Sequence, residues 1–364
     1  MTLSTESDVN KFLNSFELPG IARPISAVGR IFDLTMTDAR ITAKIELGFP
    51  AQSRYEEYRE HIAAAISAET GCDNVEIEFS SKIVAHGVQR NLKPLPNVRN
   101  VIAVASGKGG VGKSTVSVNL ALALAADGAR VGLLDADIYG PSQPQMLGLA
   151  GEQPESSDGK TMRPMEAYGI QVMSIGFLVD ADQPMIWRGP MVTSALQQLL
   201  HQTTWQDLDY LIVDMPPGTG DIQLSLSQQV PVSGAVIVTT PQNIATLDAR
   251  KGLAMFRKVA VPVLGIIENM STHICSNCGH EESVFGAGGG EQMASDFDIR
   301  LLGQLPLDVR IREQTDSGKP TVVAEPESAI AAAYRAAGQN MTAALAQQGR
   351  DYSSKFPNIV VEDS

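Results

Sequence analysis

The fold is decided by the stretch Gly107-Lys108-Gly109-Gly110-Val111-Gly112-Lys113-Ser114. It follows the apolar run Val101 to Ala105 and leads through Thr115 into a helical pattern of apolar residues. Glycines allow successive backbone N–H groups to turn inward and bind phosphate oxygens, while Lys113 can reach the β- and γ-phosphates and the Ser114 hydroxyl can ligate Mg²⁺. Because strand, glycine loop, Lys-Ser and helix occur in this order, the sequence predicts a nucleotide-binding loop at the start of a helix.

Length and composition predict a globular protein with more than one domain. The chain has 364 residues, which exceeds the roughly 100 to 200 residues usual for one domain. With 43% hydrophobic and 19% charged residues, global disorder is excluded. No transmembrane helix or secretory signal is expected, and three cysteines cannot form a disulfide framework, so we expect a cytoplasmic protein. The net charge of −13 argues against nucleic acid or a membrane as a partner.

Two segments with different sequence patterns meet near residue 90. Alternating apolar residues at 41–47 and 75–79 flank a helical pattern at 55–66, which predicts a small α+β domain over residues 1–88. Residues 89–98 are expected to form a linker, because the run around Pro94 and Pro96 is polar. A longer α/β series follows over 99–348, and residues 349–364 are expected to form a loosely ordered tail.

The longer series has near-continuous apolar runs, which are typical of buried parallel strands. Helical patterns separate most of them, and the last predicted helix spans Ser328 to Leu345. Strand and helix alternation over this length predicts an α/β fold with a mostly parallel, doubly wound sheet and ligands at the carboxyl ends of its strands. The predicted strands are Val101–Ala105, Ala129–Leu134, Ile170–Ile175, Leu211–Val213, Ala235–Thr239, Val263–Ile267 and Leu301–Leu305.

Carboxylates follow two of these strands. Asp214 ends an apolar strand, where a partner of Mg²⁺ is expected, and Gly218 follows where a backbone N–H could sense the γ-phosphate. Asp137 could orient the attacking water, and Asp135 could support the metal shell. Acids at strand ends also cap helices or stay solvated. Because three of them face one phosphate loop, we favour nucleotide hydrolysis, with Lys113 as a further catalytic group.

Cys275-Ser276-Asn277-Cys278 is the second chemical motif, in a polar loop after a predicted strand. The C-x-x-C spacing lets two thiolates bind one metal centre, but zinc and [4Fe–4S] sites usually take four ligands. A dimer that donates one pair per subunit would complete either site. His273 and His280 could instead complete a strained zinc site within one chain. A thioredoxin-like redox pair fits poorly, because the motif opens no helix.

With its additional Lys108, the segment Lys108–Thr115 resembles the deviant Walker A box of the dimeric ATPases that include MinD, ParA and the nitrogenase iron protein. That resemblance implies that Lys108 acts across the interface of a homodimer. Residues 98–325 as a whole resemble the Mrp/ApbC family of iron–sulfur cluster carrier ATPases. The matching segments are Gly107–Thr115, Asp135–Ser142, Trp187–Pro190, Asp214–Asp221, Glu268–Ser271 and Cys275–Cys278.

The family resemblance implies a function and a set of ligands. Cys275 and Cys278 of two subunits would hold a labile [4Fe–4S] cluster, which passes to apo-proteins as ATP is bound or hydrolysed with Mg²⁺. Asn269 would lie near the adenine. The amino-terminal segment is similar to a small iron–sulfur cluster assembly domain but has no cysteine in the loop Leu47–Ala51, so we expect no metal or thiol chemistry there. Cys72 follows a predicted helix end and is expected to be structural, because a free cysteine is usually inert packing. The segment that contains Arg188 is expected to pack at the interface without assigned chemistry.

Two other functions stay open on sequence grounds. A positioning ATPase like MinD or ParA needs a basic amphipathic helix or a basic stripe, which residues 351–364 lack, and it leaves the cysteine pair without a role. A zinc-stabilised binding scaffold is also compatible, because cysteine ligands suit both zinc and iron. The sequence favours the cluster carrier.

Overall fold

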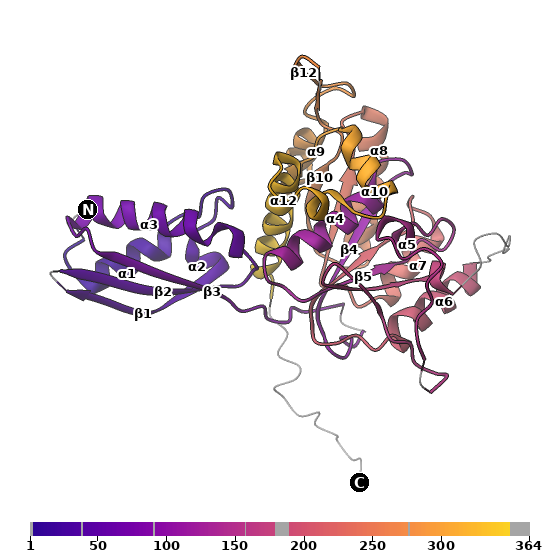
Figure 1. Cartoon of the computed structure of the whole chain (residues 1–364), viewed down its shortest axis with the longest axis horizontal. Coiled ribbons are helices and arrows are strands. Elements are labelled where there is room, and N and C mark those ends of the chain that lie inside the picture. The colour runs from indigo at the N-terminus through magenta and orange to yellow at the C-terminus, as the bar shows by residue number, and fades with distance from the viewer. Residues whose placement is uncertain are drawn as a thin grey trace, which may run out of the picture.

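The computed structural model describes residues 3–37, 39–89, 92–156, 158–178, 189–275 and 277–349. Within these ranges there are two main sheets, each with its own hydrophobic core and helices (Figure 1), and a third sheet of only two strands. We refer to residues 3–81 as the small unit and to residues 98–349 as the large unit. Trp187, Arg188 and the tail beyond 349, for which the sequence raised expectations, lie outside the described residues.

The small unit is a three-stranded sheet with helices on one face (Figure 1). Strand β2 pairs antiparallel with β1 and parallel with β3. Alternate residues of β2 are buried, as the two-residue period predicts. Its elements are α1 (Glu6–Ser15), α2 (Ile25–Val28), β1 (Gly29–Thr37), β2 (Arg40–Leu47), α3 (Tyr55–Thr70) and β3 (Val75–Ser81).

The large unit contains an eight-stranded sheet in the order β13-β10-β9-β4-β8-β5-β7-β6. All neighbouring strands are parallel except β6, which pairs antiparallel with β7 at the edge. Each of the seven predicted apolar runs forms a strand, and the predicted α/β class is confirmed. The strands are β4 (Val98–Ser106), β5 (Val131–Asp135), β6 (Met165–Ala167), β7 (Ile170–Ser174), β8 (Leu208–Asp214), β9 (Gly234–Thr239), β10 (Val263–Glu268) and β13 (Leu301–Gln304).

Helices surround this sheet, and α4 is the most deeply buried of them. Every residue of α4 from Val116 to Leu124 is buried, since the helix is apolar on all sides and packs between the sheet, α11 and α12. The helices are α4 (Lys113–Ala126), α5 (Gln143–Met146), α6 (Gly189–Gln202), α7 (Asp221–Gln229), α8 (Asn243–Lys258), α9 (Gly289–Phe297), α10 (Val309–Asp316), α11 (Thr321–Ala324) and α12 (Ala329–Ala346). Within the described ranges, no helix has the length and apolar character needed to cross a bilayer.

The small unit docks on the far ends of α4 and α12. Asp127 ends α4 and is 1% exposed. Its carboxylate accepts hydrogen bonds from the Ser53 backbone N–H (3.1 Å) and from the Gln339 side chain of α12 (2.7 Å). Ala343 of α12 is buried in the core of the small unit. The helix that begins at the phosphate loop therefore ends at the junction between the two units.

Candidate functional site

The phosphate-binding loop joins the carboxyl end of β4 to α4. Gly110 and Gly112 have φ angles of +80° and +78°, a left-handed conformation that favours glycine. The loop packs directly on α8, because a Cβ atom at Gly107 would lie 2.1 Å from the carbonyl carbon of Asp248. Lys108 is partly buried, and its ammonium forms no ion pair with any residue that the structure describes. The predicted loop is thus formed, with backbone N–H groups concentrated at the start of α4.

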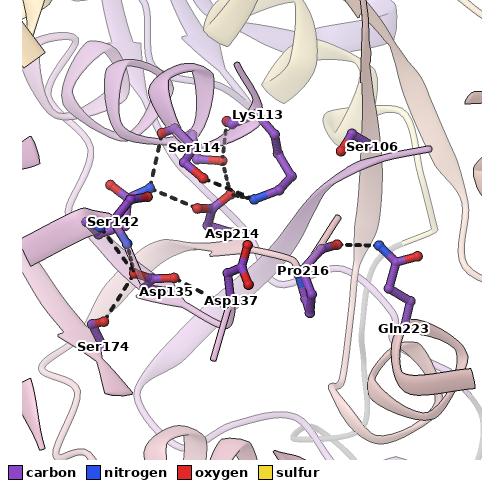
Figure 2. Close-up of polar contacts among 12 residues, drawn as sticks. Ser106, Lys113, Ser114, Asp135, Asp137, Ser142, Ser174, Asp214, Pro216 and Gln223 are labelled. Atoms are coloured by element: carbon purple, nitrogen blue, oxygen red, sulfur yellow. Dashed lines mark hydrogen bonds and ion pairs between the residues drawn. The ribbon is translucent and has the colours of Figure 1, made fainter. Parts of the chain in front are cut away.

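Lys113 and Asp214 form a buried ion pair at the centre of the site (Figure 2). The Lys113 Nζ lies 2.5 Å from Oδ1 of Asp214, and the two side chains are 5% and 0% exposed. The Ser117 hydroxyl donates to the same oxygen (2.9 Å). Gln143 donates its amide to the other oxygen (3.0 Å) and to the Ser114 carbonyl (3.1 Å). In this arrangement the predicted phosphate-binding lysine neutralises the predicted metal-binding carboxylate.

Asp135 lies one strand away and holds the segment that carries Gln143. Burial and the nearby Asp214 carboxylate raise the pKa of Asp135 to about 7, against the lowering effect of its hydrogen bonds. Gln143 links the two carboxylates, because its backbone N–H donates to Asp135 and its side-chain amide donates to Asp214. The donors to Asp135, at 3.0–3.1 Å, are the N–H groups of Asp137, Ser142 and Gln143 and the Ser174 hydroxyl.

Asp137 is the third carboxylate near the Lys113–Asp214 ion pair (Figure 2). Figure 2 shows it between Asp214 and Pro216, on the same side of the site as the Lys113 ammonium. Burial raises the pKa of Asp137, while the positive charge of Lys113 opposes the rise. A carboxylate with a raised pKa is a better proton acceptor for an attacking water. The structure thus brings Lys113, Asp137 and Asp214 together.

Gly218 differs from its predicted arrangement. The Pro216-Pro217 turn brings Gly218 beside the end of β4, where its N–H donates to the Ser106 carbonyl (3.1 Å). With φ at +103°, Gly218 has a conformation that favours glycine. The N–H expected to face a γ-phosphate is therefore engaged within the protein. Gln223 fixes the same turn by donating to the Pro216 carbonyl.

Asn269 braces the phosphate loop. It is 5% exposed, and its side-chain amide donates to the Val111 carbonyl (2.9 Å). The fit is close, because a Cβ atom at Gly112 would lie 2.3 Å from Asn269 Nδ2. The family resemblance implied an adenine contact for Asn269, and the structure shows this bond to the loop.

Sequence reasoning missed Ser117 and Gln143, which both bind Asp214. Ser117 lies one helical turn after Lys113, so the helical period could have identified it. Gln143 lies 71 residues from Asp214 in the chain, and nothing in its local pattern distinguishes it.

Cys275 and Cys278 lie on a hairpin that projects from the large unit beyond α9 (Figure 1). Its short strands are β11 (His273–Ile274) and β12 (Glu281–Glu282). Cys275 is partly buried and Cys278 is exposed. Backbone N–H groups of Cys278 and Asn277, with the Cys278 thiol, lower the pKa of the Cys275 thiol. Because metals bind the thiolate, this environment favours a metal ligand.

The cysteines form a pair rather than a complete site. Among the described residues, no group of three or more His, Cys, Asp and Glu side chains is arranged to hold a metal. The His273 ring instead contacts the Leu307 carbonyl (2.9 Å). The zinc site suggested within one chain from His273, Cys275, Cys278 and His280 is therefore not formed there. Cys72 lies in the small unit and packs partly buried against its core.

Comparison with known proteins establishes the family. The model of the NUBPL iron-transfer P-loop NTPases, within the ParA group, matches residues 97–342. The chain belongs to this family of iron-transfer P-loop NTPases. An iron-sulfur cluster carrier protein of Haemophilus influenzae is 48% identical over 349 residues, which cover 96% of this chain and 94% of that protein. The iron-sulfur cluster transfer protein NUBPL of Mus musculus is 56% identical over 256 residues, or 70% of this chain and 80% of that protein.

A solved relative supports the fold of this NTPase. The nucleotide-binding protein of Archaeoglobus fulgidus, determined with ADP, is 38% identical and superimposes with a TM-score of 0.56. The match covers 64% of this chain and 90% of the archaeal chain. The family and the fold thus agree with the loop geometry described above.

Proposed function

We propose that the chain is an ATP-binding and ATP-hydrolysing carrier, which holds a labile [4Fe–4S] cluster and transfers it to apo-proteins. The observation that carries the proposal is a pair of free cysteines, Cys275 partly buried and Cys278 exposed, on a hairpin connected to the carboxyl edge of the same sheet as the phosphate loop. The names of the Haemophilus and mouse relatives support the cargo. Free thiols suit the reducing cytoplasm, where we place the protein.

In this proposal, the loop residues 107–115 hold the nucleotide. Lys113 would bind the β- and γ-phosphates, while Asp137 would orient the attacking water and Asn269 would lie near the adenine. The donor set fits Mg²⁺, since Ser114 offers a hydroxyl and Asp214 a carboxylate, and the ion would neutralise charge on the phosphates. Lys108 would contact the nucleotide of a partner subunit.

The cysteine pair supplies two thiolates, and a [4Fe–4S] cluster usually takes four. A homodimer that brings together Cys275 and Cys278 of both subunits completes that set. ATP would then change the spacing or exposure of the pairs through its different affinity for two dimer states. Recipient apo-proteins would accept the cluster when this change exposes it.

The cargo is tested by anaerobic reconstitution with iron and sulfide, read by visible absorption and Mössbauer spectra. We expect about one [4Fe–4S] cluster per dimer in the native chain, and none in the Cys275→Ala/Cys278→Ala variant. Cys72→Ala is the matched control and should keep the cluster. A double variant that retains the same cluster would refute the assignment. Tightly bound zinc, with no cluster after reconstitution, would support the scaffold function instead.

The nucleotide site is tested separately with Lys113→Ala. The variant should lose ATP hydrolysis, because the phosphate-binding ammonium is removed, while cluster assembly remains measurable. Unchanged turnover would show that the loop is not the site of hydrolysis.

A further inference from the structure

The segment Glu268–Ser271 contacts both the phosphate loop and the base of the cysteine hairpin. Asn269 donates to the Val111 carbonyl of the loop (2.9 Å). The neighbouring Glu268 side chain binds elsewhere: Oε2 accepts from the Gly290 backbone N–H (2.5 Å) and Oε1 from the Gln304 side chain (3.0 Å). Two consecutive residues thus hold two parts of the protein that the proposed function requires to act together.

Residues 272–288, which contain the hairpin, are attached to this segment at their amino end. The Ser271 N–H and hydroxyl both donate to the Leu305 carbonyl, at 2.9 and 3.0 Å. The Thr272 carbonyl accepts from the Leu307 N–H (2.7 Å), one residue before the hairpin strand begins. Leu305 in turn donates its N–H to the Glu268 carbonyl (2.8 Å). The amino end of the hairpin is therefore fixed to the Glu268–Ser271 backbone.

The carboxyl end of the hairpin is attached to Glu268 itself. Gly290 lies in the first turn of α9, directly after the hairpin. A Cβ atom at Gly290 would lie 3.0 Å from the Glu268 side chain, so the two residues approach as closely as glycine permits. The Glu268 carboxylate is fully buried and faces the N-terminal end of α9, where a negative charge is stabilised. It therefore sets the point at which the chain returns from the hairpin.

An open pocket lies beside the base of the hairpin. This cavity of about 200 Å³ is lined by residues that include Glu268, Ser271, Thr272, Glu281 and Gln304. Because this pocket opens to solvent, the space beside the base of the hairpin is not filled by core side chains.

We propose that Glu268 is a positioning residue that couples the phosphate loop to the cysteine hairpin. The inference rests on the proposed function, in which nucleotide state controls the cysteine pair. A shift of the Val111 carbonyl on phosphate binding moves Asn269, and the shared backbone carries the shift to Glu268, the start of α9 and both ends of the hairpin. The coupling needs only that nucleotide binds more tightly to one of the two hairpin positions.

Hydrogen–deuterium exchange of the full chain tests this coupling, with and without saturating Mg·ADP. In the native chain, ADP should protect residues 107–115 and also change the exchange of 272–290 by about fivefold or more, the lower end of usual allosteric coupling. Glu268→Ala should keep the protection of the loop and lose the hairpin response. Glu268→Gln should restore the response, because its amide oxygen can accept from Gly290.

Glu281→Ala is the matched control. Its carboxylate lines the same cavity but forms no hydrogen bond or ion pair within the described part of the chain, so the hairpin response should stay native. If Glu268→Ala fails to fold, Gln304→Ala is the alternative. Gln304 is exposed, and its removal deletes one of the two hydrogen bonds to the Glu268 carboxylate, so the hairpin response should be reduced. A native hairpin that ignores ADP, or a full response in Glu268→Ala or Gln304→Ala, would overturn the proposal.

The exchange measurement requires no cluster, so its outcome is separate from that of the proposed function. Absence of a cluster after reconstitution would refute the carrier function and leave the exchange result unaffected. With a cluster bound, ADP should alter the visible circular dichroism of the native chain and should not alter that of Glu268→Ala. An equal spectral change in both chains would contradict the role of Glu268.

Discussion

Asp127→Ala should weaken the junction between the two units. The substitution leaves the Ser53 N–H and the Gln339 amide without their buried acceptor. Each buried polar group that loses its partner costs about 1 to 3 kcal/mol. Gln339 lies 3.3 Å from the Ser53 hydroxyl and can keep that contact, which offsets part of the loss. We therefore expect the free energy of unfolding to fall by about 2 to 4 kcal/mol.

Urea denaturation of the full chain, followed by far-ultraviolet circular dichroism, measures this change. Asp127→Asn keeps one acceptor oxygen and should lose about half as much stability. Asp73→Ala is the control, because Asp73 is an exposed loop residue of the small unit, and its effect should stay within about 0.5 kcal/mol. If Asp127→Ala matches this control, the carboxylate does not hold the junction and the reasoning is wrong.

Three further predictions concern the sites. Since burial raises the pKa of Asp135 to about 7, the folded chain retains a proton that the unfolded chain releases near pH 4. The free energy of unfolding should thus fall as the pH rises from 4 to 7, by about 2 to 4 kcal/mol more in the native chain than in Asp135→Asn. Urea denaturation at several pH values measures this difference. Gly107→Ala places a methyl group against the α8 backbone and should weaken nucleotide binding at least about tenfold in a fluorescence titration. Gly252→Ala on α8 is the control, because its methyl group meets only ordinary contacts and should leave the affinity unchanged. Equal affinities of the two variants would contradict the packing argument. Cys275 should react with iodoacetamide at pH 7 faster than Cys72, because its pKa is lowered, and equal rates by mass spectrometry would argue against that shift.

The strands of the large sheet could be predicted because each is a short, near-continuous apolar run. Parallel strands that are covered on both faces need such runs. The phosphate loop could be predicted as well, because its motif depends only on the local spacing of residues. Strand β1 was missed for a physical reason: its pairing shifts between Phe32 and Thr35, and Asp33 has a φ angle of +59°, so the two-residue alternation is interrupted.

Contacts between distant residues could not be predicted in the same way. Asn269 reaches Val111 across 158 residues of chain, and that contact exists only because parallel strands end at one edge of the sheet. Cys275, Cys278 and Asp214 could be identified as candidate site residues from the sequence. Their hydrogen-bond partners depend on the fold.

Under the proposed function, the Lys113–Asp214 ion pair has a consequence for how phosphate and magnesium affect each other's binding. A phosphate that attracts the Lys113 ammonium leaves the buried Asp214 carboxylate without its counterion. A magnesium ion that binds Asp214 likewise leaves the buried Lys113 ammonium without its counterion. Either ligand alone therefore bears the cost of an unpaired buried charge. When both arrive, each released group gains a new partner, so each ligand raises the affinity of the other. The site should respond to magnesium and nucleotide together, and only weakly to either alone.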